Sequence, residues 1–265
     1  MLHAFLIFII ALLTGTFGVI IGAGGGFIFV PALLLFFNMS PVVAAGTGIV
    51  VVMINSLSGI IGYAKQHRIN YKLGIVLAVG ATPGTFIGIW FNRTSPSQIF
   101  YLIFSIMILA LGLFILFKKA PEENLEIKAE IAASLDDYSS DSDLFKQFKF
   151  YTFLIVGLLL GVVSGYLGIG GGWLLVPILI YIFGVLPHNA TATSLFSLCL
   201  YSTIGVMIQI NYGNIDWAVV LWGGIGVLFG AQLGVILSKK LSGKWIVKML
   251  SVILIVVGIQ LLFIH

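Results

Sequence analysis

The chain has 265 residues, of which 60% are hydrophobic and only 8% are charged, and its mean hydropathy is +1.17. A soluble domain usually carries about 25% charged residues, so this composition excludes a water-soluble surface and indicates an integral membrane protein. The net charge of +4 fits bases at the edges of membrane helices. It does not indicate nucleic-acid binding, because no basic cluster is interleaved with aromatic residues.

Five apolar segments fill the first part of the chain, and they span residues 4–21, 27–37, 42–63, 73–91 and 99–117. A bilayer takes about 20 residues of helix to cross. The second segment is much shorter, at roughly 17 Å of helix, so we expect a broken or re-entrant helix there. The first two segments either cross the bilayer separately or together form a re-entrant hairpin, and the other three are long enough to span.

A polar stretch separates these segments from a second set of five. Eight of the nine acidic residues lie between 122 and 143, as is typical of a solvated linker. The later apolar segments cover residues 153–167, 173–183, 190–210, 219–237 and 246–264. The sequence therefore predicts a first transmembrane repeat at 1–117, a polar acidic cytoplasmic linker at 118–149 and a second transmembrane repeat at 150–265.

The two sets are copies of one unit, related by a constant offset of 146 residues without gaps. Gly22–Gly26 aligns with Gly168–Gly172 and Pro31 with Pro177. The same offset aligns Pro41, Thr47, Ser56, Gly80, Gly84 and Gly88 with Pro187, Thr193, Ser202, Gly226, Gly230 and Gly234. We therefore predict an all-α membrane protein of about 8–10 transmembrane segments, built from two repeats.

The basic residues predict the orientation of these repeats. If each half has five segments that alternate sides, 12 of the 13 Lys and Arg residues fall on one side and only Arg93 on the other. The positive-inside rule makes the first side cytoplasmic, so the linker lies inside and both termini lie outside a plasma membrane of the bacterial inner-membrane type. An odd number of segments per half also inverts one repeat relative to the other, as in many secondary transporters.

The two glycine elements carry the clearest candidate site, formed by Gly24, Gly25 and Gly26 with Gly170, Gly171 and Gly172. Each element interrupts an apolar run and precedes a short helix. Glycines leave backbone N–H groups accessible, and a helix N-terminus adds partial positive charge, so together they predict an anion cradle without charged side chains. The alternative is that these glycines only allow close helix packing.

Hydroxyl side chains accompany the glycine elements in both halves. Thr47 and Thr193 follow a proline in the first turns of a predicted helix, and Ser194 comes next to Thr193. Their hydroxyls are candidates to donate to the oxygens of an anion. The alternative is that they bond back to their own helices.

A further polar group lies in the middle of a predicted helix, opposite Tyr201, Ser202 and Thr203 in the second set of segments. The group comprises Asn55, Ser56 and Ser58. These side chains either line a path or hold helices together, and the pattern favours holding helices together.

Several absences narrow the function. No Asp or Glu lies deep in a predicted span, which argues against a cation carrier, and Asp216 is placed to cap a helix. The single Cys199 makes neither an intrachain disulfide nor a metal cage. No zinc-protease or nucleophile-elbow motif is present, so we expect no enzyme activity, no metal and no cofactor.

The glycine elements with their flanking residues, 22–31 (GAGGGFIFVP) and 168–177 (GIGGGWLLVP), resemble the duplicated motif of the TauE/SafE sulfite exporter family. The stretches at 41–47, 187–193 and 213–217 agree with that resemblance. It implies a membrane transporter of small sulfur-containing anions, such as sulfite or organosulfonates like sulfoacetate. The positions that carry over are the two glycine elements and the paired threonines.

The sequence thus predicts a secondary transporter that moves a small sulfur-containing anion by alternating access. An anion channel and a non-transporting membrane scaffold are the alternatives. The expected partners are a small anionic substrate and the lipid bilayer, without nucleic acid.

Overall fold

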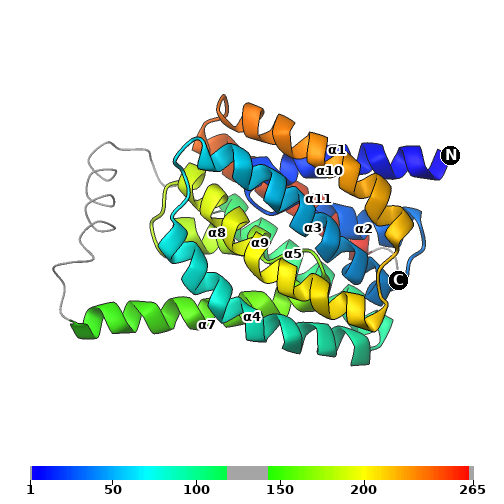
Figure 1. Ribbon diagram of the computed structural model, residues 1–265, viewed down its shortest axis with the longest axis horizontal. Helices are drawn as coiled ribbons and strands as arrows, with labels where there is room; N and C mark the ends of the chain where they lie inside the picture. Colours follow the sequence, from blue (N-terminus) through cyan, green and yellow to red (C-terminus); the bar gives the residue numbers. More distant parts are fainter. Residues whose placement is uncertain (1, 118–142, 263–265) are drawn as a thin grey trace.

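The computed structural model describes residues 2–117 and 143–262, and within these ranges the regular structure is entirely helical (Figure 1). The helices in chain order are α1 Leu2–Ile21, α2 Gly26–Phe36, α3 Pro41–Ala64, α4 Tyr71–Thr94, α5 Ser97–Phe117, α7 Asp143–Leu167, α8 Gly172–Tyr181, α9 Pro187–Tyr212, α10 Trp217–Ser238 and α11 Gly243–Leu262.

Helix length and composition confirm an all-α membrane fold. Within the described ranges, seven helices are long and apolar enough to cross a membrane, namely α1, α3, α4, α5, α7, α9 and α10. Helices α2 and α8 are apolar but have only 11 and 10 residues, or roughly 15–17 Å of helix. They are too short to span, as the sequence predicts.

The helix boundaries follow the repeat offset. Helices α2 to α5 begin at residues 26, 41, 71 and 97, and α8 to α11 begin at 172, 187, 217 and 243, so each pair differs by 146. Helix α7 begins at Asp143, inside the stretch that the sequence predicts as a linker (118–149). The earlier part of that stretch, through residue 142, lies outside the described residues.

Each short helix turns back along the helix before it. The aromatic rings of His3 and Phe37 lie 6.0 Å apart, which brings the end of α2 beside the start of α1. The rings of Phe153 and Phe183 lie 4.5 Å apart in the corresponding place beside α7 and α8. A methyl group added at Gly25 would lie 2.6 Å from the carbonyl oxygen of Thr14, so α2 starts next to the middle of α1. The helical breaks therefore lie deep within the bundle.

Helices are exchanged between the two halves. Helix α1 packs along α10, and α7 packs along α4, at opposite edges of the bundle in Figure 1. Glycines make both contacts close: an added methyl group at Gly84 would strike the carbonyl oxygen of Leu158, and one at Gly230 would strike that of Leu12. These two contacts are copies under the offset of 146. Small residues that bring backbones together are typical of helix packing in membranes.

Helices α3 and α9 lie between these edges and pack on each other, while α5 packs on α11. The outward faces of the outer helices are strongly apolar. On α4, for example, Val79 is 59% exposed and Phe86 is 53% exposed. A surface of this kind is matched by lipid tails and not by water.

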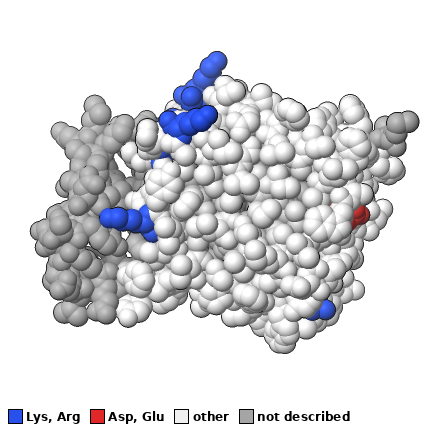
Figure 2. Space-filling model, in the orientation of Figure 1, with Lys and Arg blue, Asp and Glu red and all other residues white. Residues whose placement is uncertain are grey.

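Charged side chains gather at the two ends of the bundle. On the face in Figure 2, most visible basic atoms lie toward the left end, and the visible acidic atoms lie at the right end. A guanidinium nitrogen of Arg68 lies 3.5 Å from Nδ1 of His188, at the start of α9. The guanidinium of Arg93 stacks 3.7 Å above the ring of Tyr212, at the end of α9. The two arginines are thus separated by the length of a spanning helix.

Because α4 and α7 are in close contact, we predict that one added methyl group between them destabilises the folded protein. Gly84→Ala should lower the free energy of unfolding by about 1–3 kcal/mol, because the methyl group meets backbone atoms that cannot move alone. Thermal unfolding in detergent measures the effect. Gly224→Ala is the matched control, because its methyl group meets only Cδ1 of Ile54, at 3.2 Å. Equal unfolding temperatures for the two variants would contradict the packing argument.

Candidate functional site: the paired glycine elements

The two glycine elements depend on backbone conformations that side chains disfavour. Gly22, Gly24 and Gly25 have φ angles of 82°, 74° and 79°, and Gly168 and Gly170 have φ angles of 67° and 73°. Such left-handed conformations are accessible to glycine at little cost. They let the chain leave α1 or α7 and reverse within a few residues.

The elements from the two halves touch each other. A methyl group added at Gly172 would lie 2.5 Å from the carbonyl oxygen of Gly22, and one at Gly26 would strike that of Ile169. Gly24 and Gly170 both face the side chains of Val52 on α3 and Leu198 on α9. Val52 and Leu198 are repeat counterparts, so Gly24 and Gly170 lie against a symmetric pair of apolar side chains.

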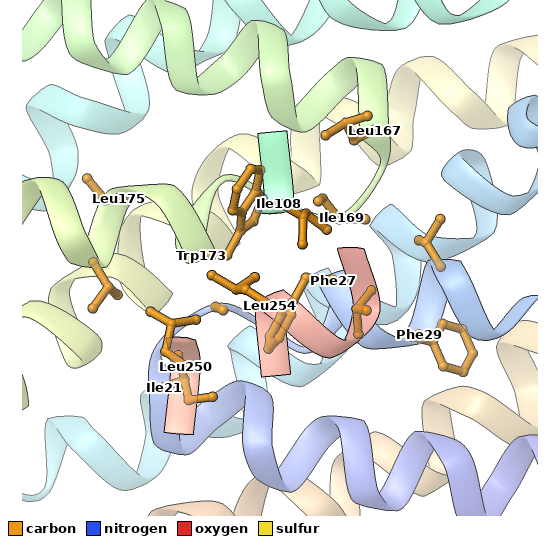
Figure 3. Packing of buried hydrophobic residues seen from close by; sticks show 14 of the residues in the cluster. Ile21, Phe27, Phe29, Ile108, Leu167, Ile169, Trp173, Leu175, Leu250 and Leu254 are labelled. Carbon is orange, nitrogen blue, oxygen red and sulfur yellow. The ribbon is translucent and has the colours of Figure 1, made fainter. Parts of the chain in front are cut away.

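The first turns of α2 and α8 are held by one apolar cluster. Phe27 and Trp173, each the second residue of its short helix, have no exposed surface. They lie with Ile108 of α5 and Leu254 of α11 in Figure 3, and all four belong to the same core cluster. Both pairs obey the offset of 146. This packing fixes the N-termini of the short helices in the middle of the bundle.

The first N–H groups of a helix have no intrahelical acceptor. In α2 the first local backbone bonds come from Ile28 and Phe29, which both donate to the carbonyl oxygen of Gly25. The N–H groups of Gly26 and Phe27 precede them. In α8 the corresponding bonds come from Leu174 and Leu175. Each short helix therefore directs a positive dipole end and donors to the place where the two elements meet.

The predicted threonines have partners that the sequence did not indicate. The backbone N–H of Asp216 donates to Oγ1 of Thr47 over 3.0 Å, and the N–H of Asn70 donates to Oγ1 of Thr193 over 3.0 Å. Asn70 and Asp216 are repeat counterparts that also cap α4 and α10. Each threonine thus joins its own half to the other. A role of these hydroxyls in substrate binding stays a prediction.

Ser194 also connects the halves, because its hydroxyl donates to the carbonyl oxygen of Gly22 over 2.9 Å. The carboxylate of Asp216 accepts from the N–H groups of Ala218 and Val219, over 3.0 and 3.1 Å. Asp216 is therefore a helix cap, as predicted. Among the residues that the structure describes, no group of three or more His, Cys, Asp or Glu side chains is placed to hold a metal.

Two polar side chains beside the glycine elements were not predicted as site residues. Both amide atoms of Asn55 and the hydroxyl of Ser56 are fully buried without a hydrogen-bond partner. Of this polar group, Ser58 does hold helices together, because its hydroxyl accepts from the side-chain amide of Gln232 over 2.8 Å. The sequence alone gives little indication that Asn55 and Ser56 belong to the site, because their position relative to the glycines depends on the packing of α3.

The family model described as sulfite exporter TauE/SafE matches residues 7–261. The chain belongs to the TauE/SafE sulfite exporter family. The match takes in both glycine elements and nearly every helix described above, which confirms the resemblance drawn from the sequence. The family description agrees with a membrane transporter and not with an enzyme.

Curated relatives are similar over almost their whole length. The chain is 31% identical to the probable membrane transporter protein YunE of Bacillus subtilis, covering 96% of each chain. It is 28% identical to a probable membrane transporter protein of Methanocaldococcus jannaschii, over 97% of this chain and 94% of the relative. A probable membrane transporter protein of Xylella fastidiosa is 26% identical over 85% and 81%. No solved structure matches the chain.

The cross-half threonine bonds predict matched effects on stability. Thr47→Val and Thr193→Val keep the side-chain shape but leave a backbone N–H without its acceptor, so each should lower the free energy of unfolding by about 1–3 kcal/mol. Chemical unfolding in detergent measures this. Thr47→Ser and Thr193→Ser keep the acceptor and should lose much less. A serine variant as unstable as its valine counterpart would show that the methyl group matters and the bond does not.

Proposed function

We propose that this protein is a secondary transporter that carries a small sulfur-containing anion, sulfite or an organosulfonate such as sulfoacetate, by alternating access. The observation that carries the proposal is the meeting of two helix N-termini and their glycine elements in the middle of the bundle. A helix N-terminus binds oxyanions through backbone N–H groups and its dipole. The family description supports the choice of sulfur oxyanions.

The charge distribution supports an anion as substrate. Asp216 is engaged as a helix cap, and the site contains neutral donors in place of carboxylates. Carboxylates are the usual ligands of cations and protons inside membrane carriers. A site made of N–H and hydroxyl donors instead suits a ligand that brings its own negative charge.

The enclosure of the site supports alternating access as the mode of transport. Val52 and Leu198 lie against both glycine elements, with Cγ1 of Val52 2.9 Å and Cδ1 of Leu198 2.7 Å from a methyl group added at Gly170. Apolar side chains fill the meeting point in this conformation. Entry of an anion therefore requires the surrounding helices to shift, which is how carriers with inverted repeats operate.

Counterflow in liposomes tests the proposal. Purified protein is reconstituted into vesicles loaded with unlabelled sulfite or sulfoacetate, and uptake of the labelled anion is followed. Sulfate, chloride and acetate serve as competitors. Saturable exchange inhibited by sulfur oxyanions supports the carrier. Rapid flux without saturation would instead indicate an anion channel, and no flux through correctly inserted protein would favour a scaffold.

If the glycine elements bind the anion, one methyl group added there should strongly reduce transport. Gly25→Ala should reduce sulfite exchange at least about tenfold, because the methyl group meets the backbone of Thr14 and alters the start of α2. Gly213→Ala controls for backbone strain. Gly213 has a φ angle of 68° but nothing within 4 Å of the added methyl group. If Gly25→Ala exchanges sulfite like the wild type, the glycine element is not the binding site.

We also propose that the end of the bundle bearing Lys65 and Arg68 is cytoplasmic, so that both termini lie outside. Labelling of single-cysteine variants in a Cys199→Ser background tests this in intact cells. An impermeant maleimide should label Ser97→Cys, at the exposed first residue of α5, and should not label His67→Cys, in the exposed turn after α3. The reverse pattern would contradict the orientation.

A further inference from the structure

The two halves of the site differ at the repeat counterparts that lie beside the glycine elements. Asn55 on α3 corresponds to Tyr201 on α9, and Ser56 corresponds to Ser202, each pair separated by 146 residues. All four side chains are at most 1% exposed. Burial is therefore the same in the two halves, and the difference lies in the hydrogen bonds.

In the second half these polar groups are satisfied within the protein. The N–H of Gly171, the residue before α8, donates to the hydroxyl oxygen of Tyr201 over 2.8 Å. The hydroxyl of Ser202 donates back to the carbonyl oxygen of Cys199, over 3.2 Å. Tyr201 thus occupies the backbone donor directly before α8 and fills the space beside the second glycine element.

In the first half the corresponding groups are left open. Neither amide atom of Asn55 has a partner, and nor does the hydroxyl of Ser56. Nδ2 of Asn55 lies 3.4 Å from a methyl group added at Gly25, and Oγ of Ser56 lies 3.3 Å from one added at Gly24. Both side chains are therefore directed at the first glycine element.

A buried polar group without a partner is costly, and each one in a folded protein calls for an explanation. Three such atoms lie beside a helix N-terminus whose first N–H groups have no acceptor within the helix. The N–H groups earlier in the turn are already engaged, because those of Ala23 and Gly24 donate to the carbonyl oxygen of Gly18. A ligand with several acceptor oxygens would satisfy the open donors together.

We propose that the anion is bound by the first half alone, through Asn55, Ser56 and the N–H groups of Gly26 and Phe27, and that Tyr201 closes the equivalent place in the second half. This inference rests on the proposed transport function. The ligand class is a sulfite or sulfonate headgroup, whose three oxygens accept from the amide, the hydroxyl and the helix N-terminus. Because all of these donors are neutral, the ligand supplies the only full charge.

The repeat offers a matched pair of variants. Ser56→Ala should raise the KM for sulfite counterflow about tenfold or more, because a hydrogen bond to a charged group is worth roughly a tenfold to hundredfold change in affinity. Ser202→Ala removes the same atom at the counterpart position and should leave KM within about twofold. Equal effects of the two variants, or no effect of Ser56→Ala, would overturn the proposed asymmetry.

Asn55→Asp provides a second and independent test. It keeps the side-chain shape but places a negative charge beside the ligand, so exchange of sulfite and sulfoacetate should be lost. Asn55→Ala should retain weak exchange with a raised KM. Both are compared with Ser202→Ala, the control of the first test. If Asn55→Asp exchanges sulfite normally, the first half does not bind the anion.

The outcomes separate this inference from the proposed function. Wild-type vesicles without saturable exchange of any sulfur anion would contradict the transport function itself, and the inference with it. Saturable wild-type exchange with a large effect of Ser202→Ala and none of Ser56→Ala would place the ligand in the second half and overturn the inference alone. Unfolding temperatures in detergent, with and without sulfite, identify variants that fail to fold. Sulfite should stabilise the wild type and Ser202→Ala more than Ser56→Ala.

Discussion

The constraint on which this structure depends is that backbone polar groups inside a bilayer need partners. A broken helix at membrane depth is tolerated only where protein or a water-filled cavity covers it. Here each break covers the other, because Gly26 abuts Ile169 and Gly172 abuts Gly22. Helices α3 and α9 enclose the pair through Val52 and Leu198. Neither half would bury its own break without the second copy.

The exchange of helices follows from the same need and limits how the protein can move. Backbone contacts join α1 to α10 and α7 to α4, and each pair includes one helix from each half. A motion of one sequence half against the other would break both contacts. Transport by alternating access is easier to reconcile with units that keep α1 with α10 and α4 with α7. The moving bodies then differ from the repeats seen in the sequence.

Much of the fold could be predicted because it depends on local pattern. Apolar length gave the spanning helices, and the offset of 146 located Gly22–Gly26 and Gly168–Gly172 as equivalent breaks before short helices. The helix cap at Asp216 could also be predicted from the sequence. The partners of Thr47 and Thr193 were not, because each bonds to a residue in the other half. The open polar atoms of Asn55 were not predictable either, because only the packing of α3 against the first element reveals them.

The difference between the two halves bears on the repulsion that two anions would experience if both copies of the cradle were occupied. Two equal cradles in contact could each bind an anion. Two unit charges 4 Å apart repel each other by about 4 kcal/mol at an effective dielectric constant of 20. Double occupancy would therefore cost much of the affinity of either cradle. A hydroxyl at Tyr201 that accepts from Gly171 removes a donor from one cradle without adding charge. In the proposed mode of binding, one anion per transport cycle follows from a single difference between repeat counterparts, tyrosine in one half and asparagine in the other.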